Sequence, residues 1–382
     1  MDKKAIISAL DKLTSRGMDF GLERERKLLD ALSSPDKKLK IIHIAGSNGK
    51  GSVAEYITRI LTAAGKRTGT FTSPAVYDYF ETVRIDGKPI DDGLFERAFG
   101  QALDVCGNCT RFEVETAAAL YAFELAGCEY AVVECGLGGL YDATNAVANK
   151  EIAIITSISL EHTAILGGSI KDICRHKAGI IKNCPAVVSG CVKGEAREYF
   201  EDLGATFADG DTEYGFNLNG ACQRYNAATA VAAARLLGIE EKFIREGIEK
   251  ATLLGRLERI DANGTTYILD GAHNEEAFTP LAEYLKNFKD IKIIYGCLSD
   301  KDADGCLKKL EGLALSVTAV KPESPRAMPL EKIEAACKRH FKEVDTAQTV
   351  SGALDKIKAR TVVVCGTFTL LKEAKSWIEK RL

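Results

Sequence analysis

The chain has 382 residues, which is long for a single hydrophobic core and predicts two domains. Hydrophobic residues make up 46% and charged residues 27% of it, and the net charge is -3. This composition excludes a general attraction to nucleic acid or to an anionic membrane, so we expect small-molecule partners, no nucleic acid and no membrane.

The N-terminal segment MDKKAIISALDKLTSRG (1–17) carries charges throughout. It predicts neither a signal peptide nor a membrane-spanning helix, and a cytoplasmic location is the expectation. The twelve cysteines are then expected to be reduced thiols. Cys106 and Cys109 form a CxxC pair, but a zinc or redox site would need further partners, so buried or incidental thiols are favoured.

The first half of the chain alternates strands with helices. Apolar runs at 38–45, 66–74, 129–136 and 151–159 predict strands, and their Val and Ile content is typical of buried parallel strands. Apolar residues at helical spacing predict a helix over 52–65, which Gly65 ends.

The second half begins after a helix-rich stretch that runs from residue 222 to about 251. Strand candidates then recur at 256–261, 265–274, 291–300, 314–322 and 360–368. We therefore predict an α/β protein with an N-terminal P-loop-type, mostly parallel sheet domain over 1–252. A second, smaller Rossmann-like α/β domain is predicted over 253–382, with the hinge near 251–256.

Ligands of parallel sheets bind beyond the carboxyl ends of the strands, and the sequence GSNGKGS (46–52) stands at such an end. In a phosphate-binding loop, glycines let backbone N–H groups surround the phosphates, a lysine neutralises charge and a hydroxyl holds magnesium. Gly46, Gly49, Lys50 and Ser52 supply these parts. Gly51 is inserted before the hydroxyl, so the loop is a variant, and an ordinary glycine-rich turn is the alternative.

Three further strand ends or loops carry polar residues. Glu134 ends one apolar run and His162 follows the next, and they could serve as a metal ligand and as an imidazole near the same edge. A helix cap, a salt bridge or a structural hydrogen bond is the alternative for each. Lys177 lies in the basic segment RHKAGIIK (175–182). Charge complementarity with the phosphate site is the simple explanation for this segment, and a lysine on a helix face is the alternative that the residues alone favour.

Taken together, the motifs AGSNGKGS, TSP, ECGLGG, DATN, LEHT, KAGIIK, QRYNA, GRLE and LDGAHN occur in an order that resembles one known family. The chain is similar to folylpolyglutamate synthase and dihydrofolate synthase, members of the Mur ligase superfamily. The resemblance covers nearly the whole chain.

The resemblance implies an ATP-dependent carboxylate–amine ligase. The acceptor carboxylate, on dihydropteroate or a reduced folate, would attack the γ-phosphate, and L-glutamate would then displace phosphate from the acyl phosphate. Lys50 and Mg²⁺ would neutralise the charge gathered in the first step. Closure of two domains around the reactants would exclude water.

The resemblance also implies site residues. The ATP-binding loop would comprise Gly46, Ser47, Asn48, Gly49, Lys50, Gly51 and Ser52. Two Mg²⁺ ions would be held by Ser52, Ser73, Glu134 and His162, and by Lys177 once it is carbamylated; a monovalent cation such as K⁺ is a further candidate. Lys50, Lys177 and His162 are the implied catalytic residues.

The remaining implied contacts fall on both predicted domains. Asn226 would meet adenine, Arg256 the phosphates and Asp270 the ribose, and His273 is a candidate for the glutamate end. Residues 1–252 would then be the ATP-binding domain and 253–382 the glutamate-ligase domain of a monomer.

Two departures and two alternatives remain open. The family usually has His-Leu after TSP and Arg after GLGG, where this chain has Ala75, Val76 and Leu140, so folate contact is in doubt. Another Mur-superfamily amino-acid ligase with a different carboxylate acceptor is one alternative, although no room for an additional N-terminal domain is expected. A P-loop switch or transport ATPase is the other.

Overall fold

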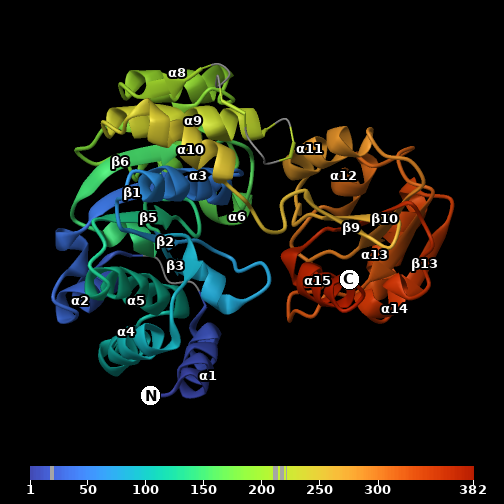
Figure 1. The fold of residues 1–382 in the computed structure, drawn as a ribbon, viewed down its shortest axis with the longest axis horizontal. Coiled ribbons are helices and arrows are strands. Elements are labelled where there is room, and N and C mark those ends of the chain that lie inside the picture. Colours follow the sequence, from blue (N-terminus) through green and yellow to red (C-terminus); the bar gives the residue numbers. More distant parts are fainter. Residues whose placement is uncertain (18–20, 210–213, 216–218, 221) are drawn as a thin grey trace. The chain divides into compact units, whose positions relative to one another are not determined.

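The computed structural model describes residues 1–17, 21–209, 214–215, 219–220 and 222–382, which form two compact units (Figure 1). Unit 1 comprises the described residues of 1–74, 80–217 and 223–251. Unit 2 comprises residues 75–79 and 252–382 together with the described residues between 218 and 222. A short segment of the N-terminal half, 75–79, therefore belongs to unit 2.

Unit 1 is built on a sheet whose described strands have the order β4-β3-β2-β5-β1-β6-β7-β8. The strands are β1 (Lys40–Ala45), β2 (Thr68–Phe71), β3 (Val83–Ile85), β4 (Lys88–Pro89), β5 (Tyr130–Glu134), β6 (Lys150–Ile155), β7 (Ala186–Ser189) and β8 (Thr206–Ala208). All neighbours pair in parallel except β3 and β4, which add an antiparallel edge. Because β1 lies between β5 and β6, the carboxyl ends of these three strands meet at one edge.

Helices cover both faces of this sheet. They are α1 (Lys3–Leu13), α2 (Glu23–Ala31), α3 (Lys50–Ala63), α4 (Asp92–Val105), α5 (Arg111–Leu125), α6 (Thr163–Leu166), α7 (Ile170–Ala178), α8 (Gly194–Asp202), α9 (Gln223–Leu236) and α10 (Glu241–Lys250). Helix α3 packs with α9 and α10 on one face, and α5 packs with α2 and α4 on the other (Figure 1). Strands β1 and β5 are buried between these layers, which explains why both read as continuous apolar runs.

Unit 2 is a smaller sheet covered by its own helices. Its strand order is β13-β12-β11-β14-β10-β9, and only β9 runs antiparallel to its neighbour. The strands are β9 (Glu258–Ala262), β10 (Thr265–Leu269), β11 (Ile291–Tyr295), β12 (Ser316–Val320), β13 (Val344–Ala347) and β14 (Thr361–Cys365). The helices are α11 (Glu275–Leu285), α12 (Ala303–Lys308), α13 (Leu330–His340), α14 (Val350–Leu354) and α15 (Leu371–Glu379).

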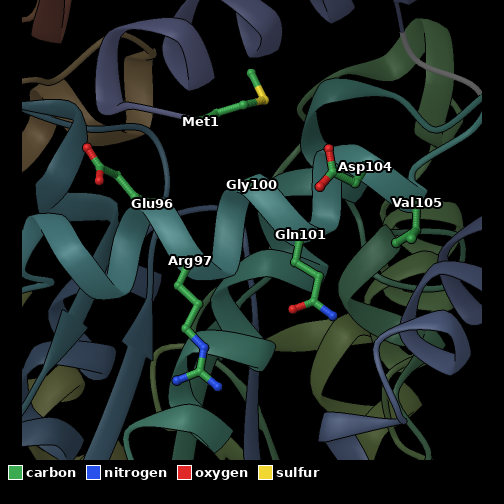
Figure 2. A pocket seen from close by; sticks show the side chains of 7 residues that line it. All are labelled: Met1, Glu96, Arg97, Gly100, Gln101, Asp104 and Val105. Carbon is green, nitrogen blue, oxygen red and sulfur yellow. The ribbon is translucent and has the colours of Figure 1, made fainter.

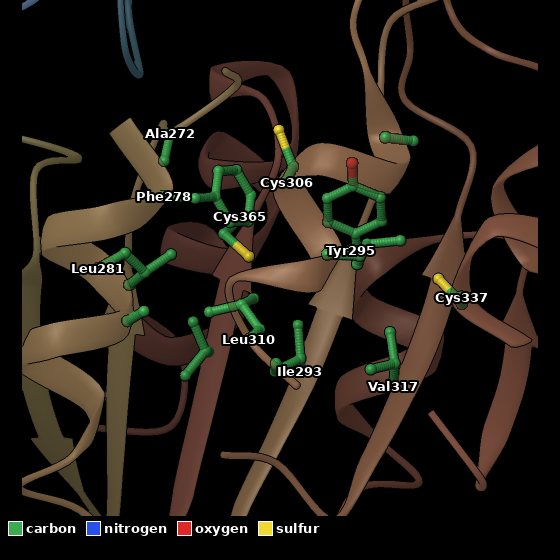
Figure 3. Packing of buried hydrophobic residues seen from close by; sticks show 14 of the residues in the cluster. Ala272, Phe278, Leu281, Ile293, Tyr295, Cys306, Leu310, Val317, Cys337 and Cys365 are labelled. Carbon is green, nitrogen blue, oxygen red and sulfur yellow. The ribbon is translucent and has the colours of Figure 1, made fainter. Parts of the chain in front are cut away.

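The core of unit 2 contains several thiols among its aliphatic and aromatic side chains. Figure 3 shows Cys306, Cys337 and Cys365 beside Tyr295 and Phe278, all of them buried. Burial raises the pKa of the Cys306 thiol to about 12. No cysteine forms a disulfide among the described residues, and the buried thiols of this core act as small hydrophobic side chains.

The predicted fold class is confirmed. Each predicted strand overlaps an observed one, and the helix predicted over 52–65 is α3, which begins two residues earlier at Lys50. The short strands β3, β4, β7, β8 and β13 were not predicted. Within the described ranges, no helix combines the length and apolar character needed to cross a bilayer.

Candidate functional site

The loop of residues 46–52, called the 46–52 loop, joins the carboxyl end of β1 to α3. Gly46 and Gly49 have φ values of 152° and 87°. A Cβ atom on Gly46 would lie 2.0 Å from Thr156 Oγ1, and one on Gly49 would lie 2.5 Å from Asn226 Oδ1. Both positions therefore require glycine, and the loop backbone approaches Asn226 closely.

Two hydroxyl residues that follow β6 anchor this loop. The Thr156 hydroxyl donates to the Asn48 carbonyl oxygen at 2.6 Å, and the Asn48 N–H donates to Ser157 Oγ at 2.8 Å. The Ser47 N–H donates to the Ser157 carbonyl oxygen at 3.0 Å. The loop is thus fixed by contacts to its neighbours that do not involve its lysine.

Lys50 and Ser52 lie in the first turn of α3. Lys50 Nζ donates to the carbonyl oxygens of Gly46 at 2.9 Å and Ser47 at 3.4 Å, so its charge stays at the loop. Gln223 Nε2 donates to the Ser52 hydroxyl at 3.3 Å. The first N–H groups of a helix attract anions, and α3 is a helix of 14 residues. Its N-terminus, the lysine and the glycines of the loop therefore form an arrangement suited to binding phosphate.

Glu134 brings a carboxylate to the same place from the end of β5. Its side chain is buried, and Oε2 accepts the Ser73 N–H at 3.4 Å. The same oxygen lies 3.7 Å from where a Cβ atom on Gly51 would stand. The predicted ligands Ser73 and Glu134 are therefore neighbours of each other and of the 46–52 loop.

This donor set suits magnesium. Among the described residues, no group of three or more His, Cys, Asp and Glu side chains is arranged to hold a metal on its own. Mg²⁺ commonly uses one or two carboxylates and completes its shell with water and substrate phosphates, so one carboxylate with nearby hydroxyls beside a phosphate loop fits it.

Lys177 lies in the last turn of α7 and is not a solvated helix-face residue, since only 1% of it is exposed. Its Nζ donates to Glu161 Oε1 at 2.6 Å. Burial lowers the pKa of Lys177, while the charge of Glu161 acts in the opposite direction. Burial raises the pKa of Glu161, but Lys177 and Lys50 lower it overall, so a negative charge faces both lysines.

His162 follows Glu161 and precedes α6. Its backbone has the left-handed conformation, with φ 46° and ψ 39°, and His162 is exposed to solvent. The two neighbours therefore differ in environment, with Glu161 turned to the buried lysine and His162 at the surface of the same loop.

In unit 2, Asp270 follows β10 and anchors the turn around Arg256. Asp270 Oδ2 accepts the Leu257 N–H and Oδ1 accepts the Ala272 N–H, both at 2.7 Å. Burial raises the pKa of Asp270, and the Arg256 charge opposes that shift. Asp270 is 6% exposed, and both of its carboxylate oxygens accept backbone N–H groups, so it holds the backbone of this turn in place.

Arg256 and His273 lie around the ring of Phe368. The Arg256 guanidinium carbon stands 4.5 Å from the ring centroid, and the His273 ring centroid stands 6.4 Å from it. His273 Nδ1 lies 2.9 Å from the Gly271 carbonyl oxygen. Unit 2 therefore gathers Arg256, Asp270 and His273 at one end of its sheet.

Four residues around the 46–52 loop were not singled out from the sequence: Thr156, Ser157, Glu161 and Gln223. Glu161 and Gln223 lie within the motifs LEHT and QRYNA, and Thr156 and Ser157 lie in the strand predicted over 151–159. Polar residues at strand ends were the available signal, but their contacts to the loop depend on packing. One surface pocket lies elsewhere, against Met1 and the α4 residues of Figure 2, and no predicted site residue lines it.

Two family models match the two halves of this chain. The family model for the Mur ligase middle domain matches residues 44–191, and the model for the Mur ligase glutamate ligase domain matches residues 255–368. The dihydrofolate synthase/folylpolyglutamate synthase of Bacillus subtilis is 34% identical over 359 residues, covering 81% of this chain and 83% of the relative.

Solved structures are similar over the full length. Escherichia coli FolC in complex with DHPP and ADP matches with a TM-score of 0.89 and 30% identity, covering 100% of this chain and 98% of that one. A bifunctional folylpolyglutamate synthase/dihydrofolate synthase with Mn, AMPPNP and L-glutamate bound matches with a TM-score of 0.86 and 29% identity, covering 98% of both chains.

Proposed function

This chain belongs to the dihydrofolate synthase/folylpolyglutamate synthase family of Mur ligases, and we propose that it is an ATP-dependent ligase that adds L-glutamate to dihydropteroate, to the glutamate tail of reduced folates, or to both. It gives ADP and phosphate through an acyl phosphate. The relatives with bound ADP, AMPPNP, DHPP, Mn and L-glutamate support ATP, a divalent metal and small-molecule substrates.

The observation that carries this proposal is the 46–52 loop with Glu134 beside it. The loop presents Lys50 and the N-terminus of α3 at the edge where β5, β1 and β6 end, and Glu134 Oε2 lies next to Gly51. A cradle for phosphates with an adjacent carboxylate is what transfer of the γ-phosphoryl group requires.

The reaction has two steps. A carboxylate oxygen of the acceptor attacks the γ-phosphorus of ATP, and ADP leaves. The α-amine of glutamate then attacks the acyl carbon, phosphate leaves and the amine loses a proton. Lys50 stabilises the charge that builds up in the first step. Its Nζ is already held at the loop by the carbonyl oxygens of Gly46 and Ser47, so little reorganisation is needed.

The metal ligands are part of the proposal. Ser52, Ser73, Glu134 and His162, with Lys177 in a carbamylated form, would hold two Mg²⁺ ions, and K⁺ is a candidate for a further site. When bound, Mg²⁺ supplies positive charge to the phosphate oxygens. Burial of Lys177 beside Glu161 supports the modification, because burial favours the neutral amine that reacts with CO₂. An intact mass without the extra carbamate would contradict it.

The remaining roles follow the family. Asn226 contacts adenine, Arg256 the phosphates and Asp270 the ribose, and His273 serves the glutamate end. Residues 1–252 bind ATP and residues 253–382 form the glutamate-ligase domain of a monomer. The close approach of Asn226 to Gly49 supports a nucleotide role for Asn226.

The test is ADP release by purified protein with ATP, magnesium and glutamate, comparing dihydropteroate with tetrahydrofolate as acceptor. Release with both means a bifunctional enzyme, and release with one identifies the acceptor. No glutamate-dependent release with either, from protein shown to bind ATP, would mean a different carboxylate acceptor. ADP release that does not depend on added glutamate would instead favour a P-loop switch or transport ATPase.

A further inference from the structure

Residues 75–79 belong to unit 2, and the carboxylate of Glu258 is one of the groups that hold them there. The Tyr77 hydroxyl donates to Glu258 Oε2, and Lys375 Nζ of α15 donates to Glu258 Oε1 at 2.5 Å. Lys375 Nζ also lies 5.6 Å from the centroid of the Tyr77 ring. The side chains of Glu258 and Lys375 are 13% and 24% exposed, so solvent competes only partly for these bonds.

Glu258 also holds the turn that carries Arg256. Its Oε2 accepts the Gly255 N–H at 2.8 Å, and the Gly255 carbonyl oxygen accepts the Gly271 N–H at 2.8 Å. Leu257 is held in turn by Asp270. Both neighbours of Arg256 in the chain are therefore fixed by side chains that the ligase chemistry itself does not use as nucleophile or base.

An apolar contact joins the same two segments. Gly255 has φ 60°, and a Cβ atom there would lie 2.6 Å from Val76 Cγ1 and 2.9 Å from Leu371 Cδ1. Val76 and Tyr77 both pack against the unit 2 core cluster that contains Leu371 and Phe368. Glycine at 255 is what permits the close approach of Val76, at a position where the family usually has other residues.

We propose that Tyr77, Glu258 and Lys375 form a clamp of positioning residues, which holds the segment after Ser73 and the turn at Arg256 in the geometry that ligation needs. Ser73 is two residues before Ala75, the first residue of the clamped segment, and its N–H bonds to Glu134. The clamp thus holds the turn that carries a candidate phosphate contact, and the segment it holds continues the chain from a candidate metal ligand. This inference rests on the proposed function for its activity readout.

The test uses Tyr77→Phe, Glu258→Gln and Lys375→Met in the full chain, with Tyr121→Phe as the matched control. The Tyr121→Phe variant also loses one side-chain bond, to Gln101 Oε1 at 2.9 Å. Tyr121 lies on α5 and belongs neither to residues 75–79 nor to the clamp. Tyr77→Phe keeps the ring and its packing, so it stays informative if Glu258→Gln folds poorly. We expect kcat for ADP release to fall by about tenfold or more in Tyr77→Phe, because small misplacements of reacting groups cost rate.

Two further readouts separate positioning from a structural role. Amide hydrogen exchange of peptides covering 73–82, measured without substrate, should be faster in Tyr77→Phe than in the wild type or Tyr121→Phe. The double variant Tyr77→Phe with Lys375→Met should lose less activity than the product of the single losses, because both bonds act through one carboxylate.

The outcomes are distinct. Faster exchange with a lower kcat supports the clamp, and rescue of kcat by Lys375→Arg, which keeps a donor, supports it further. Faster exchange with an unchanged kcat overturns the positioning role, and unchanged exchange overturns the clamp whatever the activity. If the wild type releases no ADP with any acceptor, the proposed function fails, while the exchange measurement still decides whether the segment is clamped.

Discussion

The two units fix the loops that carry their candidate binding residues in different ways. In unit 1, the 46–52 loop is anchored by Thr156 and Ser157, and Lys50 donates only to carbonyl oxygens of its own loop among the bonds described. In unit 2, the acid Asp270 is itself the anchor, since its two oxygens hold the N–H groups of Leu257 and Ala272.

This difference separates two kinds of residue. Where anchoring and binding belong to different side chains, the binding residue can be removed without disturbing the fold. Where one side chain does both, its removal costs stability as well as activity.

The largest effect is expected for Lys50→Ala. We expect glutamate-dependent ADP release to fall by about 10³-fold or more, because the charge at the phosphates loses its counterion. The free energy of unfolding should change by less than about 1 kcal/mol, since the loop keeps its anchors. Steady-state kinetics and denaturant unfolding measure the two quantities.

Lys250→Ala is the control for Lys50→Ala, because Lys250 pairs with Glu246 on the exposed side of α10. It should retain wild-type activity. A Lys50→Ala enzyme that keeps a substantial share of the wild-type rate would remove the loop from the mechanism.

Asp270→Asn should affect both properties. Its new amide would direct an NH₂ group at the N–H of either Leu257 or Ala272, leaving a donor against a donor. We expect a loss of about 1–3 kcal/mol in the free energy of unfolding together with lower activity. Asp345→Asn, an exposed change on β13, should do neither. A stable but inactive Asp270→Asn would show that Asp270 binds without anchoring.

Much of unit 1 could be predicted because its signals are local. Long apolar runs predicted the central strands, and the glycine and lysine spacing of residues 46–52 predicted a phosphate-binding loop there. Short strands such as β8 lack such a pattern. The partners of the loop, Thr156 and Ser157, could not be assigned, since their contacts arise only when β6 pairs with β1.

Two other features depend on packing across the fold. The burial of Lys177 requires α7 to bring it against Glu161, and no local pattern distinguishes it from a solvated lysine. Residues 75–79 stand between two segments of unit 1 in the chain, so sequence proximity places them in the wrong unit. Their place is fixed by contacts with distant parts of the chain, such as the bond from Tyr77 to Glu258, which lies 181 residues further along the sequence.

Two buried acids, Glu25 and Asp270, differ in the hydrogen bonds that their carboxylate oxygens make. Glu25 in α2 is fully buried, and neither of its oxygens has a hydrogen-bond partner among the described residues, whereas both Asp270 oxygens have one. Burial raises the pKa of Glu25 well above its ordinary value of 4.5, and the nearby Glu113 and Asp142 add to this. Glu25 is therefore protonated in the folded protein at pH values where the unfolded chain is ionised.

Glu25→Gln should consequently flatten the pH dependence of stability. In the wild type, unfolding releases the Glu25 proton above about pH 4.5, so the free energy of unfolding falls as pH rises, by up to about 1.4 kcal/mol per pH unit. The variant lacks this contribution. Urea unfolding from pH 4.5 to 7.5 measures it, with Glu331→Gln on the exposed start of α13 as control; equal slopes in wild type and variant would contradict the buried-acid account.

The smallest effect is expected for Ser157→Ala, which removes an anchor of the 46–52 loop and leaves Lys50 in place. The variant loses the bond from the Asn48 N–H to Ser157 Oγ and the bond from that hydroxyl to the Asn48 carbonyl oxygen, while Thr156 still donates to the same carbonyl oxygen. We expect a loss of about 1 kcal/mol in stability and a KM for ATP raised by about fivefold, with kcat nearly unchanged. Ser15→Ala, which removes a bond to Lys12 on the surface, serves as control. A reduced kcat at saturating ATP would instead mean that the anchors also set the position of Lys50 during transfer, and the separation of anchoring from binding in unit 1 would fail.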